Sequence, residues 1–138
     1  VIRREVEALI ADDVYPARSG TTDSEAIFLA ALSNQLAVKP IAAITKTIGQ
    51  ICQLQARYGI SDPLRFTAAM TNGIDLFAFR WSSDEHPPTL YWQASDNGLI
   101  VVSEPLDHKS SHWNAVPKNS VFSAVRNEVS CIEFLPLQ

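Results

Sequence analysis

The spacing of apolar side chains divides the sequence into a helical N-terminal part and a C-terminal part made of strands. From residue 1 to about residue 60, apolar residues recur with the period of a helix that buries one face. From residue 65 to residue 138, runs rich in β-branched and aromatic residues alternate with turn residues, which is typical of strands. Helices followed by consecutive hairpins predict a segregated α+β fold with an antiparallel sheet.

Three helices are expected in the first part. Apolar spacing over residues 6–14 predicts the first of them. The second begins at an N-cap, either Thr22 or Asp23, because hydroxyl and carboxylate side chains bind the free N–H groups of a helix start. The third begins at Pro40, which suits a first turn, and stops at Gly59.

Three hairpins are expected in the second part. The paired runs are 66–71 with 74–81, 90–94 with 99–103, and 121–125 with 129–135. The first pair flanks Asn72-Gly73, and we expect positive φ at both positions because Asn-Gly favours a tight hairpin turn. The segment 107–119 reads as largely irregular, and nothing in the chain indicates a second domain.

Several of these strands are apolar on both alternating faces. Leu76 and Ala78 alternate with Phe77 and Phe79. A strand that is apolar on both sides is buried on both sides, and the helices can cover only one face of a sheet. We therefore expect a second cover from outside this chain: more sheet, a partner subunit, or another part of the same polypeptide.

Composition and charge exclude several classes of protein. The 138 residues are 46% hydrophobic and 19% charged, so the sequence is not intrinsically disordered. The formal net charge is −4, and no basic stripe is present, which argues against nucleic acid as a partner. No apolar run approaches the ~18 residues of a membrane-spanning helix, so no membrane partner is expected.

Cysteine and histidine offer little chemistry. Cys52 and Cys131 are far apart and form no disulfide framework, so we expect free thiols in a reducing, cytoplasmic compartment. Neither has a nearby histidine or basic cluster in sequence to lower the pKa of its thiol. His108 and His112 are four residues apart, but no third ligand has suitable spacing. We expect no metal ion and no cofactor.

Residues 20–25, Gly-Thr-Thr-Asp-Ser-Glu, allow two interpretations. One is purely structural: a helix start with a cap and acidic residues in the first turn, which suit the helix dipole. The other is functional: Asp23 receives the ammonium group of a ligand through charge-assisted hydrogen bonds. The residue types alone leave both open.

Four segments in order resemble class II glutamine amidotransferases, which are N-terminal-nucleophile (Ntn) hydrolases. Residues 20–25 resemble the family's Thr-Asp-Ser/Thr-Glu motif. Residues 72–81 resemble the hairpin, residues 101–107 the Ser-Glu-Pro-Leu-Asp strand end, and residues 113–120 the Trp and Val-Pro segment of its stand-alone branch. That branch includes γ-glutamyl hydrolases of ergothioneine synthesis and glutathione breakdown. For Ser103-Glu104-Pro105, a strand end with a buried polar cap and a role in shaping the substrate cleft both remain open.

The resemblance implies a fold and a mechanism. The family's fold is a four-layer αββα sandwich with two stacked antiparallel sheets, which would supply the second cover. Its N-terminal cysteine attacks a γ-glutamyl amide, with its own α-amino group as base, and the resulting thioester is hydrolysed. An Arg binds the substrate α-carboxylate, an Asn-Gly pair helps form the oxyanion hole, and the Asp of the motif binds the α-amino group.

Of these parts, the resemblance assigns to this chain only the Asp that binds the α-amino group, as Asp23, and the neighbouring Thr22 is a second substrate-binding candidate. Residues 1–22 contain no N-terminal cysteine, carboxylate-binding Arg or oxyanion Asn-Gly at the expected places, and Asn72-Gly73 comes too late in the chain. We therefore expect residues 1–138 to be the C-terminal portion of a single amidotransferase domain. It would be inactive alone and completed by an N-terminal half or companion chain.

Two other interpretations remain. The chain could be a non-catalytic binding or assembly module that retains half of the fold and pairs with another subunit or with itself. It could also be an unrelated α+β domain. In the enzyme interpretation the partner is a small γ-glutamyl substrate, either glutamine or a γ-glutamyl conjugate.

Overall fold

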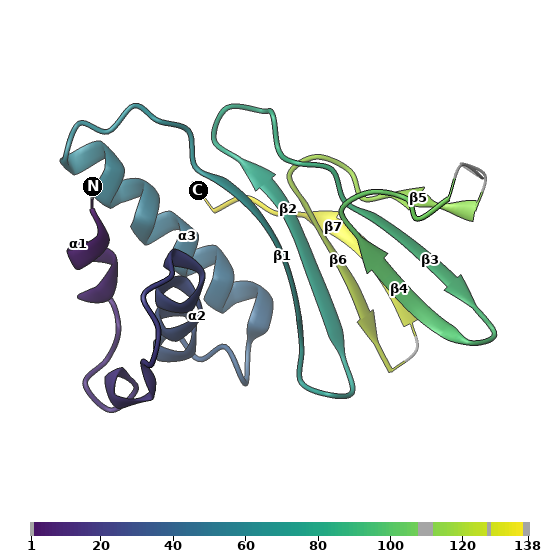
Figure 1. The fold of residues 1–138 in the computed structure, drawn as a ribbon, viewed down its shortest axis with the longest axis horizontal. Helices are drawn as coiled ribbons and strands as arrows, with labels where there is room; N and C mark the ends of the chain where they lie inside the picture. Colours follow the sequence, from purple (N-terminus) through teal and green to yellow (C-terminus); the bar gives the residue numbers. More distant parts are fainter. Residues whose placement is uncertain (1, 108–111, 127, 137–138) are drawn as a thin grey trace. The chain divides into compact units, whose positions relative to one another are not determined.

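The structure is a computed structural model that describes residues 2–107, 112–126 and 128–136 (Figure 1). The chain forms two compact units. The first comprises Val1–Asp62 with Pro136–Gln138 and contains the helices, whereas the second comprises Pro63–Leu135 and contains the strands. The predicted α+β class is confirmed. Among the described residues, no helix is both long and apolar enough to cross a bilayer.

The helical unit contains α1 (Arg3–Glu7), the 3₁₀ helix η1 (Tyr15–Ala17), α2 (Asp23–Ser33) and α3 (Pro40–Arg57). The second and third predicted helices are confirmed, with Thr22 as the N-cap of α2. Beyond the C-terminus of α3, Gly59 has φ +64°, a conformation that glycine adopts without strain.

The first helix is shorter than the apolar spacing predicts. It ends at Glu7, and the backbone N–H of Ala11 donates to Ser33 Oγ of α2 at 2.9 Å instead of continuing a helix. The apolar residues of this segment still contribute to a core, because Ile10 packs with the buried Leu29 and Ala30 of α2. Tertiary contacts have overridden the local helical period here.

The strands form two antiparallel sheets. The four-stranded sheet has the order β1-β2-β6-β7, and the three-stranded sheet has the order β4-β3-β5. Their bounds are β1 (Arg65–Thr71), β2 (Leu76–Ser82), β3 (Tyr91–Ser95), β4 (Gly98–Val102), β5 (Asn114–Ala115), β6 (Ser120–Val125) and β7 (Glu128–Glu133). All three predicted hairpins are present, but β5, which pairs with β3, lies in a segment predicted to be irregular.

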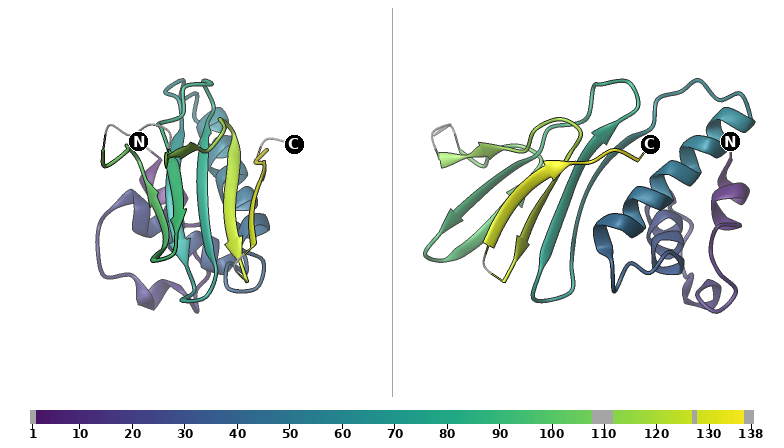
Figure 2. Two further views of the ribbon diagram at one scale, coloured as in Figure 1. Left: turned by 90° about the vertical axis from the view of Figure 1, so that its right-hand side faces the viewer. Right: turned by 180° about the vertical axis from the view of Figure 1, so that it is seen from behind.

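The two sheets pack face to face within the strand unit (Figure 2). Ala78 and Phe122 of the four-stranded sheet form one buried cluster with Leu90 and Val116, which adjoin the strands of the smaller sheet. The ring of Trp92 stacks on Phe122 with centroids 4.9 Å apart. The expectation that the second cover lies outside this chain is therefore wrong for this face, because β3, β4 and β5 provide it.

On the opposite face of the four-stranded sheet, Phe79 of β2 and two neighbouring phenylalanines are also buried. The ring of Phe79 lies 6.0 Å from Phe66 and 5.1 Å from Phe134, measured between centroids. Phe79 and its neighbour Ala78 are both completely buried although they point to opposite faces. The prediction of a strand buried on both sides is confirmed for β2.

The turn of the first hairpin differs from the prediction. It spans residues 72–75, and only Gly73 has positive φ, at +92°. The side-chain oxygen of Asn72 accepts hydrogen bonds from the N–H groups of Ile74 at 2.9 Å and Asp75 at 2.7 Å. Asn72 thus stabilises a longer loop through its side chain and keeps negative φ.

Candidate functional site

The N-terminus of α2 holds both residues that the sequence proposes for substrate binding. Thr22 is the N-cap, with an extended backbone, and its Oγ1 accepts from the N–H of Glu25 at 3.2 Å. Asp23 is the first helical residue and is exposed, and its carboxylate takes part in none of the hydrogen bonds or ion pairs found among the described residues. Since Thr22 caps the helix, the carboxylate of Asp23 is left available to a ligand.

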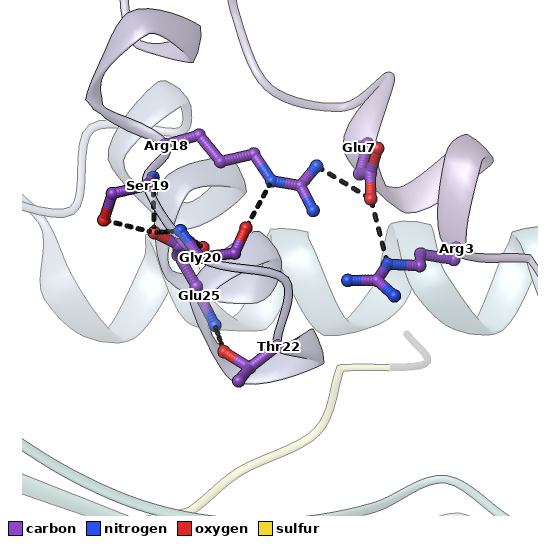
Figure 3. Close-up of polar contacts among 7 residues, drawn as sticks. All are labelled: Arg3, Glu7, Arg18, Ser19, Gly20, Thr22 and Glu25. Carbon is purple, nitrogen blue, oxygen red and sulfur yellow. Dashed lines mark hydrogen bonds and ion pairs between the residues drawn. The ribbon is translucent and has the colours of Figure 1, made fainter.

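The carboxylate of Glu25 folds back onto the loop before α2 (Figure 3). Its Oε1 accepts from the N–H of Ser19 at 2.9 Å, and its Oε2 accepts from the N–H of Gly20 at 2.8 Å. The carboxylate of Glu25 thus binds two consecutive backbone N–H groups of this loop. These bonds to the N–H groups of Ser19 and Gly20 lower the pKa of Glu25 below its usual value of 4.5.

Gly20 allows this close approach. A Cβ atom at position 20 would lie 2.9 Å from Oε2 of Glu25, which is closer than real Cβ atoms come to such atoms. The absence of a side chain at Gly20 therefore lets the carboxylate reach the backbone.

A second carboxylate, Glu7 of α1, fixes the other side of the same loop (Figure 3). Its Oε1 lies 2.7 Å from Nη1 of Arg18 and 3.1 Å from Nε of Arg3. Nε of Arg18 in turn donates to the carbonyl of Gly20 at 3.4 Å. The hydrogen bond from Arg18 lowers the pKa of Glu7, and the two side chains are only 12% and 20% exposed for Arg18 and Glu7.

This arrangement is chemically able to bind a cation at the N-terminus of α2. The start of a helix carries about half a positive charge, which by itself repels an ammonium group. The full negative charge of Asp23 exceeds that contribution at close range, and a carboxylate forms strong charge-assisted hydrogen bonds with ammonium. The carboxylate of Asp23 is therefore chemically suited to bind an ammonium group.

The remaining motifs lie in the strand unit and contact one another. Arg80 of β2 donates from Nε to the carbonyl of Pro88 at 2.9 Å and from Nη1 to the carbonyl of Val116 at 2.6 Å. The indole N–H of Trp113 donates to the carboxylate of Asp107 at 3.1 Å. The arginine of one motif and the tryptophan of another are thus structural ties between segments.

The Ser-Glu-Pro segment follows β4, as predicted for a strand end. Ser103 and Glu104 are exposed, so the buried polar cap, one of the two interpretations of this segment, is wrong. The carboxylate of Glu104 instead accepts a hydrogen bond from the hydroxyl of Thr89.

The cysteines are poor candidates for nucleophiles. Cys52 is half-buried and Cys131 exposed, and neither is in a disulfide. Burial raises the pKa of both thiols, so little reactive thiolate forms at neutral pH. Among the described residues no group of three His, Cys, Asp or Glu side chains could hold a metal. His108 lies outside the described residues, so the absence of a metal stays a prediction.

Sequence reasoning missed Glu7 and Arg18. They are eleven positions apart, and no spacing rule joins a residue of α1 to the loop before α2. The signal for Glu25 was present, because Thr22 and Glu25 have the spacing of a capping box. The structure modifies that motif, since the carboxylate reaches Ser19 and Gly20.

The two antiparallel sheets, the helical unit and the Thr-Asp-Ser-Glu motif at a helix start resemble part of a class II glutamine amidotransferase domain. A solved structure of a glutamine aminotransferase class-II domain protein from Silicibacter pomeroyi matches it with a TM-score of 0.91 and 33% sequence identity. The match covers 99% of this chain and 62% of the other chain. No protein-family model and no curated protein matches the sequence. The resemblance indicated by the motifs is confirmed.

Proposed function

We propose that this chain is the C-terminal portion of an enzyme that hydrolyses a γ-glutamyl amide, either glutamine or a γ-glutamyl conjugate. The observation that carries the proposal is the carboxylate of Asp23, which is exposed, unengaged among the described residues, and set at the end of a loop that two other carboxylates stabilise. Asp23 binds the α-ammonium group of the substrate, and Thr22 holds the start of the helix in place.

The chemistry follows the mechanism that the family resemblance implies. The thiol of an N-terminal cysteine, in a part of the domain outside these residues, attacks the γ-carbonyl carbon, and the cysteine's α-amino group takes the proton. The C–N bond breaks, and the amine leaves with that proton. Water then attacks the γ-glutamyl thioester and releases glutamate and the free thiol. Asp23 takes no part in these bond changes and fixes the substrate for them.

Replacing the carboxylate of Asp23 tests this role in the full-length polypeptide that carries the nucleophile. Asp23→Asn removes the charge and keeps the shape, so KM for glutamine should rise about ten- to a hundredfold, since a charge-assisted bond contributes roughly 1.5–3 kcal/mol. Steady-state release of glutamate or ammonia measures it. Asp96→Asn, in the exposed turn between β3 and β4, is the matched control. An unchanged KM in Asp23→Asn would contradict the assignment.

A further inference from the structure

The carboxylate of Glu25 is bound by the loop before α2 and is not directed at a ligand. It receives four of the structure's hydrogen bonds to the loop, two from the N–H of Gly20, one from the N–H of Ser19 and one from the Ser19 hydroxyl. These contacts lie only a few residues before Asp23, yet none involves the carboxylate of Asp23.

The backbone of Gly20 is held on both sides. Its N–H binds Glu25, and its carbonyl accepts from Arg18, which is paired with Glu7 of α1. The chain therefore enters α2 along a path that charged groups fix from two directions. That path determines the position of the Asp23 backbone and the direction in which its side chain extends from the helix.

We infer that Glu25 is a positioning residue for Asp23: it fixes the loop before α2 so that the Asp23 carboxylate meets the substrate ammonium in a productive geometry. The Glu7–Arg18 ion pair supports the same loop from the other side. This inference rests on the proposed function, because it gives Glu25 a role only if Asp23 binds substrate. A small misplacement of a binding group is costly in catalysis, so the effect should be measurable in kinetics.

A double-mutant cycle in the full-length protein separates positioning from simple stability. Glu25→Gln should raise KM for glutamine about tenfold with a smaller change in kcat, because one acceptor oxygen and the charge are lost. In the Asp23→Asn background, the same change should alter KM by less than about twofold, because the group that Glu25 positions has already lost its charge. Glu85→Gln, the same chemical change in an exposed loop of the strand unit, should leave KM unchanged in both backgrounds.

A second variant reaches the same contact from the other partner. Gly20→Ala places a Cβ 2.9 Å from Oε2 of Glu25, and the flexible carboxylate can move away without disturbing the fold. Its KM should rise as in Glu25→Gln, and circular dichroism should show an unchanged fold. If Glu25→Gln does not fold, Gly20→Ala supplies that arm of the cycle.

The outcomes distinguish the two proposals. If Asp23→Asn leaves KM unchanged, the proposed function fails, and Glu25 loses its role with it. If Asp23→Asn raises KM but Glu25→Gln and Gly20→Ala have no effect, or the same effect in both backgrounds, only the positioning role is overturned.

Discussion

Single arginine side chains join segments of this chain that are distant in sequence. Arg80 binds carbonyl groups at positions 88 and 116, and Arg18 connects α1 to the loop before α2. A guanidinium group suits this task because its donors diverge in a fixed plane and reach two acceptors at once. Lysine at either place would keep the charge and lose this geometry.

Arg80 should contribute measurably to the stability of the strand unit. Arg80→Met keeps most of the length but leaves the carbonyls of Pro88 and Val116 without their donor, so the free energy of unfolding should fall by about 1–3 kcal/mol. Urea unfolding followed by tryptophan fluorescence reports on this unit, since all three tryptophans lie within Pro63–Leu135. The control is Arg126→Met, at an exposed position, which should change stability little. Equal stability of the two variants would refute a structural role for Arg80.

The residues of the candidate site were only partly predictable. Asp23 and Thr22 follow from the motif and from the chemistry of helix starts. Glu7 and Arg18 do not, because their pairing depends on how α1 folds back on the loop before α2. Arg80 stood in a motif, but its acceptors are backbone carbonyls, and those leave no trace in a sequence.

At the level of elements, hairpins were predicted better than helix lengths. Alternating apolar residues with turn residues between them fix both ends of a strand pair, and β1 with β2 appears close to the expected bounds. The helix predicted over residues 6–14 does not form in full. Helix α1 is only five residues long and its start has no side-chain cap, and the Ser33 hydroxyl accepts the N–H of Ala11, which a longer helix would use. The two-residue β5 is too short to show any pattern.

The interface between the two sheets should depend on Phe122. This side chain is 1% exposed and stacks against Trp92 of the other sheet. Phe122→Ala should lower the free energy of unfolding by about 3–5 kcal/mol, because it removes buried apolar area and leaves a cavity. Urea unfolding followed by circular dichroism measures the change. Ile132→Ala, at a position 51% exposed on β7, should cost much less, and similar losses in the two variants would show that the sheet interface is not the cause.

The helical unit should lose stability in acid. The pKa values of Glu7 and Glu25 are both lowered in the folded chain, so their contribution to stability is present above their unfolded pKa, near 4.5, and disappears as the pH falls through the lower folded values. Thermal unfolding between neutral pH and about pH 3, followed by far-ultraviolet circular dichroism, should show this decline.

Removing the two carboxylates provides the control for this pH dependence. The double variant Glu7→Gln/Glu25→Gln should be less stable at neutral pH and should lose less stability on acidification than the unmodified chain. Parallel pH profiles for the two proteins would show that other groups cause the acid loss.

At the scale of the whole molecule, the four motifs are distributed between the two units. The helical unit contains Asp23, whose carboxylate is proposed to bind substrate. The strand unit contains the motifs that link its own segments. The order of the four motifs along the chain was sufficient to indicate the amidotransferase class. The stacking of the two sheets within one chain was not predictable from strand patterning, because a pattern of buried residues does not say which strands cover them.

The exposed strand β7 should influence whether copies of the protein aggregate at high concentration. It is an outer strand of the four-stranded sheet as described, and Val129 is 46% and Ile132 51% exposed. An open strand edge with apolar side chains invites pairing between copies and growth into fibrils. Glu128 and Glu133 stand at the two ends of β7, and their like charges repel when identical strands are brought together. Charged residues in such places are gatekeepers against aggregation. Strand β7 therefore contains both the apolar residues that favour aggregation and the charged residues that oppose it.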